Sequence, residues 1–119
     1  MTHWVILLMQ TVVETPIFLR RAEKLLSEEE YTDVMTCLAG DPEAGDEIVG
    51  TGGVRKLRFA AQGRGKSGGV RVIYYFYDGS MPVYALLIYG KNERADLTPE
   101  QRKSVKMFAH MIKATRRSE

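Results

Sequence analysis

Two short apolar stretches joined by a glycine-rich loop constrain what this chain can fold into more than any other feature. Residues 54–60 and 70–77 are rich in Val, Ile, Phe and Tyr, which are favoured in β-strands. The same region is unevenly charged: six basic residues and no acidic residue lie between Glu47 and Asp78, although the net charge of the chain is only +2. The remainder is therefore acidic overall, and we expect a polyanion to dock on one side of the molecule.

The first of these strands has two chemically distinct faces. Leu57 and Phe59 alternate with Lys56 and Arg58, so the two cations are expected to project together from a half-buried sheet. Charged side chains are mostly exposed in any protein, so the competing interpretation is the solvated face of an ordinary amphipathic strand. The acid-free span around the pair favours a binding face.

Capping residues predict a helical hairpin ahead of the basic strands. Thr15 is followed by Pro16, an N-cap with proline at the first helical position, and this predicts a helix that ends at about Leu26. Ser27 begins a capping box, which starts a second helix that ends at Gly40. Because the connection is so short, the two helices are expected to form a hairpin.

Two more strands and a last helix complete the expected fold. Residues 4–13 carry β-branched and large apolar side chains and predict a strand, and in residues 82–89 both alternating sets are apolar, which predicts a central strand. Thr98 caps a C-terminal helix whose charged end is expected to fray. The prediction is an α+β fold in one domain, residues 1–119. It has a mainly antiparallel sheet of about four strands, packed against an N-terminal helical hairpin and a C-terminal helix.

Composition argues against several classes of protein. Cys37 is the only cysteine, so no internal disulfide can form and a cysteine-based metal site is not expected; this usage suits a reducing cytoplasm. The apolar run at residues 5–9 lacks a preceding basic region and is shorter than the roughly 20 residues of a membrane span. We therefore expect a cytoplasmic protein without a membrane segment, bound metal or cofactor.

The glycine-rich loop superficially resembles a nucleotide-binding P-loop. It contains G-x-G-K-S, but Ala60 stands where the first glycine would be, and a strand instead of a helix follows. Nucleotide hydrolysis is therefore not predicted. A cationic loop that closes over a nucleic-acid backbone fits Arg64 and Lys66 better.

Three motifs carry a family resemblance: GTGGVRKLRFA, GKSGGVRVIYYFY and ALLIYGKNERADLTPEQ. In this order, from Met9 to Lys113, the chain resembles the RelE/ParE superfamily of toxins from bacterial toxin–antitoxin modules and is most similar to the HigB-type branch. The resemblance implies a small ribonuclease that enters the ribosomal decoding site and cleaves messenger RNA. It also implies a cognate antitoxin, commonly a helix-turn-helix protein, through which alone the toxin would contact operator DNA.

The resemblance also assigns candidate residues. Lys56 and Arg58 match paired basic positions of the family, Arg71 matches the arginine that would clamp the scissile phosphate, and Lys91 matches a lysine after the last strand. The candidate catalytic residues are therefore Lys56, Arg58, Arg71 and Lys91. The candidate RNA-binding residues are Arg55, Arg64, Lys66, Tyr77, Tyr89 and Asn92. Because Asn92 replaces an arginine and Thr98 falls where RelE has a catalytic tyrosine, the proton-transfer roles of RelE cannot be copied to this chain.

The chemistry of RNA cleavage sets independent requirements. Without a metal, the 2′-hydroxyl must lose its proton, the phosphorane charge must be neutralised, and the leaving 5′-oxygen must gain a proton. His3 and His110 are too far from the basic strands in the sequence to be assigned these steps. A lysine has a reference pKa of about 10.4, so it acts as a base at neutral pH only where like charges crowd it. Lys56 beside Arg58 and Arg71 is such a place.

Two other functions stay open at this stage. A ParE-like protein would inhibit DNA gyrase by binding alone, and the phosphate-clamping cluster argues against this mode. An inactive member would serve only as an antitoxin-binding regulator. Tyr74 to Tyr77 are more often core residues than stacking platforms, so only Tyr77 and Tyr89 are nominated for RNA contact.

Overall fold

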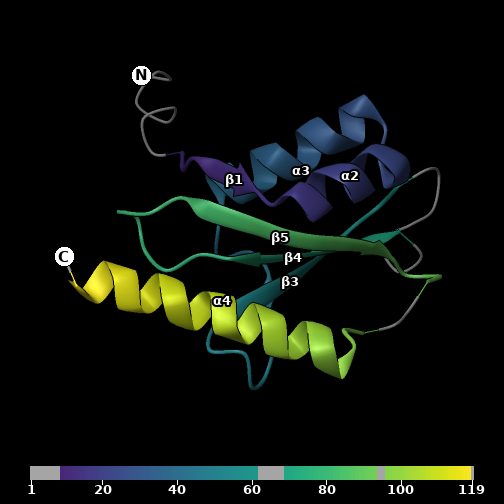
Figure 1. Ribbon diagram of the computed structural model, residues 1–119. Helices are drawn as coiled ribbons and strands as arrows, with labels where there is room; N and C mark the ends of the chain where they lie inside the picture. The colour runs from purple at the N-terminus through teal and green to yellow at the C-terminus, as the bar shows by residue number, and fades with distance from the viewer. Residues whose placement is uncertain (1–8, 62–68, 94–95, 119) are drawn as a thin grey trace, which may run out of the picture.

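The computed structural model describes residues 9–61, 69–93 and 96–118, which form a layered α+β fold (Figure 1). The elements in chain order are β1 (Val12–Glu14), α2 (Pro16–Leu25), α3 (Glu28–Gly40), β2 (Asp46–Glu47), β3 (Val54–Phe59), β4 (Val70–Tyr75), β5 (Val83–Gly90) and α4 (Pro99–Ser118). The predicted fold class is confirmed. None of the helices in the described ranges combines the length and apolarity that a bilayer crossing requires.

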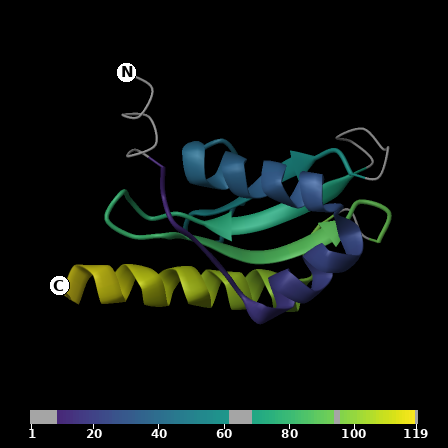
Figure 2. The ribbon, with the colours of Figure 1, turned by 90° about the horizontal axis from the view of Figure 1, so that it is seen from above.

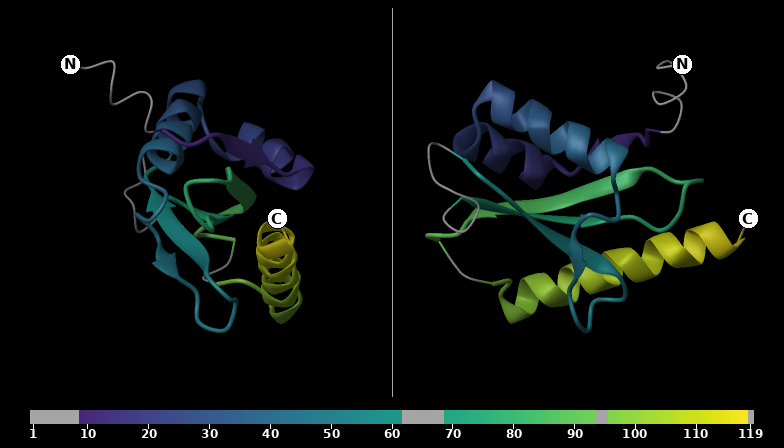
Figure 3. Two further views of the ribbon diagram at one scale, coloured as in Figure 1. Left: turned by 90° about the vertical axis from the view of Figure 1, so that its left-hand side faces the viewer. Right: turned by 180° about the vertical axis from the view of Figure 1, so that it is seen from behind.

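One five-stranded sheet lies between the helical hairpin and the C-terminal helix. Its strand order is β1-β5-β4-β3-β2, with β1 parallel to β5 and every other pair antiparallel. Helices α2 and α3 cover one face and α4 covers the other, as the end-on view in Figure 3 shows. Seen from the hairpin side, α2 lies over β5 (Figure 2). The strand predicted to be central, β5, does lie between two others.

The capping predictions are confirmed. The Thr15 side chain accepts a hydrogen bond from the Phe18 amide at 3.1 Å. Ser27 and Glu30 form the reciprocal capping box, with bonds of 2.9 and 3.1 Å. The Thr98 side chain accepts from the Gln101 amide at 3.1 Å. These bonds satisfy amides that each helix leaves open at its first turn, so short helices begin at defined residues.

Several predicted boundaries were wrong. The N-terminal strand was predicted over residues 4–13, but β1 is Val12–Glu14 and residues 4–8 lie outside the described ranges. The two-residue strand β2 was not predicted, and its pairing with β3 makes the sheet five-stranded. The C-terminal helix continues through residues 113–118, where fraying was predicted. Burial of Val105 and Ala109 anchors this helix to the sheet.

A β-bulge changes which face of the sheet the later residues of β5 point to. The sequence predicts simple alternation, but the register with β4 shifts between Ile73 and Tyr74, whose partners are Leu87 and Ala85. Leu86 is thus the extra residue, and both Leu86 and Leu87 enter the core beneath α4. The bulge also determines that Tyr89 belongs to the α4 face of the sheet.

Candidate active site

The cationic face consists of Lys56, Arg58 and Arg71. In the β3–β4 ladder, Arg58 lies directly opposite Arg71, and Lys56 lies opposite Ile73. Residues two apart on a strand share a face, and directly paired residues share it as well. Val54 and Ile73 occupy the same alternation and pack in the core beneath α4. All three cations are therefore on the α4 face, at the end of the sheet where β3 ends and β4 begins.

Arg71 is the most buried member of the cationic face. Its residue is only 3% exposed, and its Nη1 donates to the Val70 carbonyl at 3.3 Å. Burial lowers the pKa of Arg71, the nearby charge of Arg58 lowers it further, and Tyr89 raises it. The usual pKa of a guanidinium lies so far above neutral pH that the group stays charged. Arg71 is therefore a permanent, largely desolvated cation with a like charge across the ladder on the exposed Arg58.

Tyr89 and Tyr77 lie in different surroundings. Tyr89 pairs with Arg71 from the β5 side but is only 2% exposed, so its ring is buried in the core beneath α4. Tyr77 follows the opposite end of β4, six residues beyond Arg71. This separation corresponds to about 20 Å along an extended chain. The structure brings Tyr89 to the candidate site and leaves Tyr77 at the far end of the sheet.

The turn that carries Lys91 and Asn92 is held by several bonds. One carboxylate oxygen of Glu93 accepts from the Gly90 amide at 2.8 Å, and the other lies 2.5 Å from Nη2 of Arg21. Arg21 also donates from Nε to the Ile88 carbonyl at 2.8 Å. The Lys91 amide donates to the Gly69 carbonyl at 2.9 Å. Helix α2 thus fixes the end of β5 beside the start of β4, where Arg71 lies.

Sequence reasoning missed one charged residue of the site, Asp96. Its Oδ1 lies 3.9 Å from Nζ of Lys56 and 3.9 Å from Nη2 of Arg102. The same oxygen accepts from the Leu97 amide at 3.0 Å. The sequence held one sign of this contact. Asp96 lies two residues before Thr98, which caps α4, and α4 packs against the sheet. Lys56 is therefore not surrounded by cations alone, contrary to the reasoning from the basic strands.

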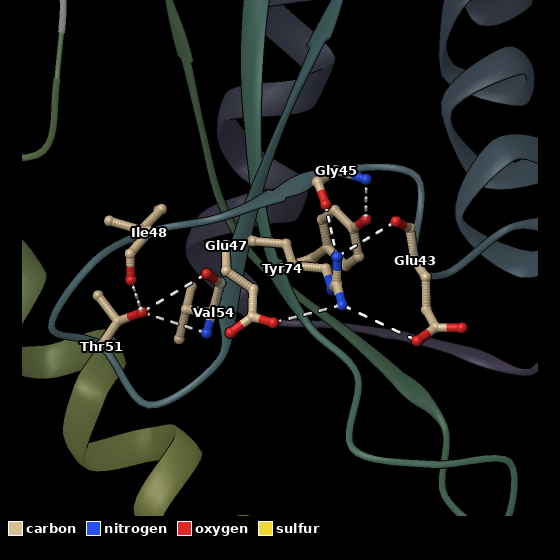
Figure 4. Close-up of polar contacts among 8 residues, drawn as sticks. Glu43, Gly45, Glu47, Ile48, Thr51, Val54 and Tyr74 are labelled. Atoms are coloured by element: carbon tan, nitrogen blue, oxygen red, sulfur yellow. Dashed lines mark hydrogen bonds and ion pairs between the residues drawn. The ribbon is translucent and has the colours of Figure 1, made fainter.

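Arg55 lies on the other face of β3 and stabilises the chain reversal before it. Its Nη1 donates to the carbonyls of Gly45 at 2.6 Å and Glu43 at 3.2 Å. Its Nη2 is 3.7 Å from the Glu47 carboxylate and 3.9 Å from that of Glu43. Figure 4 shows Glu43, Gly45 and Glu47 gathered there, with the Tyr74 hydroxyl accepting from the Gly45 amide. Arg55 is thus separate from the cationic face.

The remaining candidates are outside the cationic face or outside the described residues. Arg64 and Lys66 fall in residues 62–68, and His3 falls in residues 1–8, none of which the structure describes. Asn92 is exposed in the turn after β5, and His110 is exposed on α4. Within residues 9–61, 69–93 and 96–118, no three His, Cys, Asp or Glu side chains gather as a metal-binding group.

The fold is the small α+β fold that the three sequence motifs predict for a toxin of this class. A family model described as the RelE toxin of the RelE/RelB toxin–antitoxin system matches residues 12–119. The chain belongs to this toxin family. It is also similar to the solved free-state structure of an Escherichia coli RelE double mutant, with 18% identity and a TM-score of 0.54. The similarity covers 73% of this chain and 88% of that chain and concerns the fold.

Proposed function

We propose that this chain is a ribosome-dependent endoribonuclease that cleaves messenger RNA and thereby inhibits translation. Membership of the RelE toxin family makes it the toxin of a toxin–antitoxin pair. The observation that carries the proposal is the cationic face, where the buried Arg71 lies opposite Arg58 and on the same side as Lys56. Two adjacent guanidinium groups on a sheet face repel each other, so a phosphate that binds both is favoured.

The cationic face meets the main electrostatic demand of RNA cleavage. When the 2′-oxygen attacks the neighbouring phosphorus, negative charge develops on the two non-bridging oxygens. Arg71 is assigned a bidentate contact with these oxygens, which requires its buried guanidinium to be uncovered when RNA binds, and the exposed Arg58 contributes a second fork of donors. Because Arg71 is already desolvated, its attraction for the phosphorane is stronger than that of a solvated arginine.

Proton transfer requires a group that can change its charge, and neither arginine can. Lysine is the one side-chain type of the cationic face that serves as a proton acceptor in enzymes, so Lys56 is assigned the proton of the 2′-hydroxyl. The P–O5′ bond breaks as the 5′-oxygen takes a proton from water, which yields a 2′,3′-cyclic phosphate and a 5′-hydroxyl end. Lys91, whose amide donates to the Gly69 carbonyl at the same end of the sheet, is proposed as a fourth catalytic cation.

The wider system follows from the resemblance. The HigB-type branch implies that cuts occur at codons in the ribosomal decoding site and that the ribosome supplies the correct message geometry. The antitoxin is proposed to be a helix-turn-helix protein that blocks the cationic face and binds operator DNA itself. The toxin then acts in the cytoplasm, where ribosomes and messages are found.

In vitro translation followed by primer extension tests this proposal. Codon-phased cuts with the wild-type chain, absent with Arg71→Gln, are expected. A parallel gyrase assay distinguishes the ParE-like alternative, because supercoiling inhibition with intact messages would replace the proposed activity. Intact messages without gyrase inhibition would instead favour an inactive antitoxin-binding regulator.

A further inference from the structure

We propose that Asp96 is an internal competitor of RNA for the cationic face. In the free protein its carboxylate contacts Lys56, and a substrate phosphate takes its place when RNA binds. This inference rests on the proposed function, since it assumes that the cationic face binds nucleic acid. It assigns a role in substrate affinity to a residue outside the basic strands.

The carboxylate is held in position by its own backbone and by α4. Oδ1 of Asp96 accepts from the Leu97 amide at 3.0 Å, which fixes the carboxylate at the start of the segment leading into α4. Arg102 lies 3.9 Å from the same oxygen and donates from Nη1 to the Val49 carbonyl at 2.8 Å. The loop before β3 and the first turns of α4 therefore keep a negative charge close to Lys56.

The contact between Asp96 and Lys56 is suited to exchange. The two charged atoms are 3.9 Å apart, and the side chains are 58% and 27% exposed. An ion pair of this length and exposure contributes little to stability, because water and salt screen it. A phosphate that also contacts the two neighbouring arginines binds more strongly than this single carboxylate. RNA can therefore displace Asp96 without disturbing the fold.

The competitor role differs from two plainer roles for the same residue. If Asp96 only satisfies the Leu97 amide, its charge is irrelevant, because an asparagine oxygen accepts the same bond. If Asp96 orients Lys56 for proton transfer, loss of the charge slows cleavage and leaves RNA affinity unchanged. A competitor alone predicts tighter binding when the charge is removed.

The experiment compares Asp96→Asn with Glu100→Gln in the full chain. Glu100 is an exposed acid in the first turn of α4, so its replacement changes the net charge equally without altering the neighbour of Lys56. The probe is a short single-stranded DNA of message sequence, which lacks the 2′-hydroxyl and is not cleaved. Its Kd is measured by fluorescence anisotropy at low and high salt.

Asp96→Asn is expected to bind the probe about threefold to tenfold more tightly than Glu100→Gln at low salt, with a smaller difference at high salt. The gain should shrink when Lys56→Met is added, because the competed cation is then absent. Equal affinity of the two single variants, weaker binding by Asp96→Asn, or no measurable binding by it overturns the inference.

A ribosome cleavage assay with the same proteins separates the two proposals. Message cleavage by the wild type with equal probe affinities would overturn only the competitor role. Tighter probe binding by Asp96→Asn together with intact messages would overturn the endonuclease proposal and leave the competition in place.

Discussion

The cross-strand pair of Arg58 and Arg71 predicts that one substitution stabilises the fold while it abolishes activity. The two arginines are direct partners in the β3–β4 ladder, and the charge of Arg58 lowers the pKa of the buried Arg71. Like charges at paired positions destabilise a sheet. Arg58→Gln removes the repulsion and retains much of the side-chain stem. A gain in stability with loss of cleavage is therefore expected, as in other sites that are built at a cost to the fold.

The size of this gain follows from the burial of the two side chains. Like-charged cross-strand pairs contribute about 0.2–1 kcal/mol of destabilisation. Arg71 is buried and Arg58 is exposed, so solvent screens the pair and a value of about 0.5 kcal/mol is expected. For a domain of this size, that difference raises Tm by about 2 °C.

Thermal and urea unfolding of Arg58→Gln at low salt and at 1 M salt measure the effect. Arg20→Gln is the matched control, because Arg20 is exposed on α2 away from the cationic face and its replacement changes the net charge equally. The gain relative to this control should vanish at 1 M salt, where the screening length is about 3 Å. A loss of stability at low salt, or a gain that salt leaves unchanged, would refute the electrostatic reasoning.

Three further predictions concern the site and the fold around it. Arg71→Lys should lose at least about tenfold of message cleavage, since an ammonium cannot replace a bidentate fork; primer extension measures it, and full activity would contradict the clamp role. Arg21→Gln should weaken cleavage and accelerate hydrogen exchange of the Gly90 amide, because Glu93 loses its ion pair with Arg21 and holds that amide less firmly; unchanged exchange would argue against a positioning role. Burial and the bond to Glu14 raise the pKa of Tyr31 to about 12. The folded protein therefore keeps Tyr31 protonated to a higher pH than the usual tyrosine pKa of 10.0 allows. Tyr31 contributes stability that is fully present below pH 10 and is lost as the pH rises from 10 to about 12. Tyr31→Phe should remove this pH-dependent contribution in unfolding experiments, and an identical alkaline profile would show that the bond is unimportant.

Much of the fold was predictable because its signals are local. The Thr15 and Ser27 caps define the helical hairpin, and the polar–apolar alternation of residues 56–59 reveals which residues share a face. The bulge at Leu86 was not predictable, because both faces of β5 are apolar and no polar residue marks a change of phase. The short β2 has no apolar pattern at all and pairs with β3 through its backbone.

The candidate site was predictable in part for the same reason. Alternation places Lys56 with Arg58, but the partner of Arg58 depends on register, which the loop between the strands determines and composition does not reveal. Asp96 was missed because its contact with Lys56 joins residues 40 positions apart. Arg55 was grouped with its basic neighbours, whereas period-two geometry turns it toward Glu43 and Glu47.

The most direct test uses ribosomes programmed with a labelled message that carries one 2′-deoxynucleotide at the decoding-site codon. We expect the wild-type chain to cut the all-ribose message there, to leave a 2′,3′-cyclic phosphate, and to leave the 2′-deoxy message intact at that bond. Arg71→Gln should cut neither message. Cleavage of the deoxy-substituted bond, or equal cleavage by Arg71→Gln, would contradict the claim that the cationic face promotes attack by the 2′-hydroxyl.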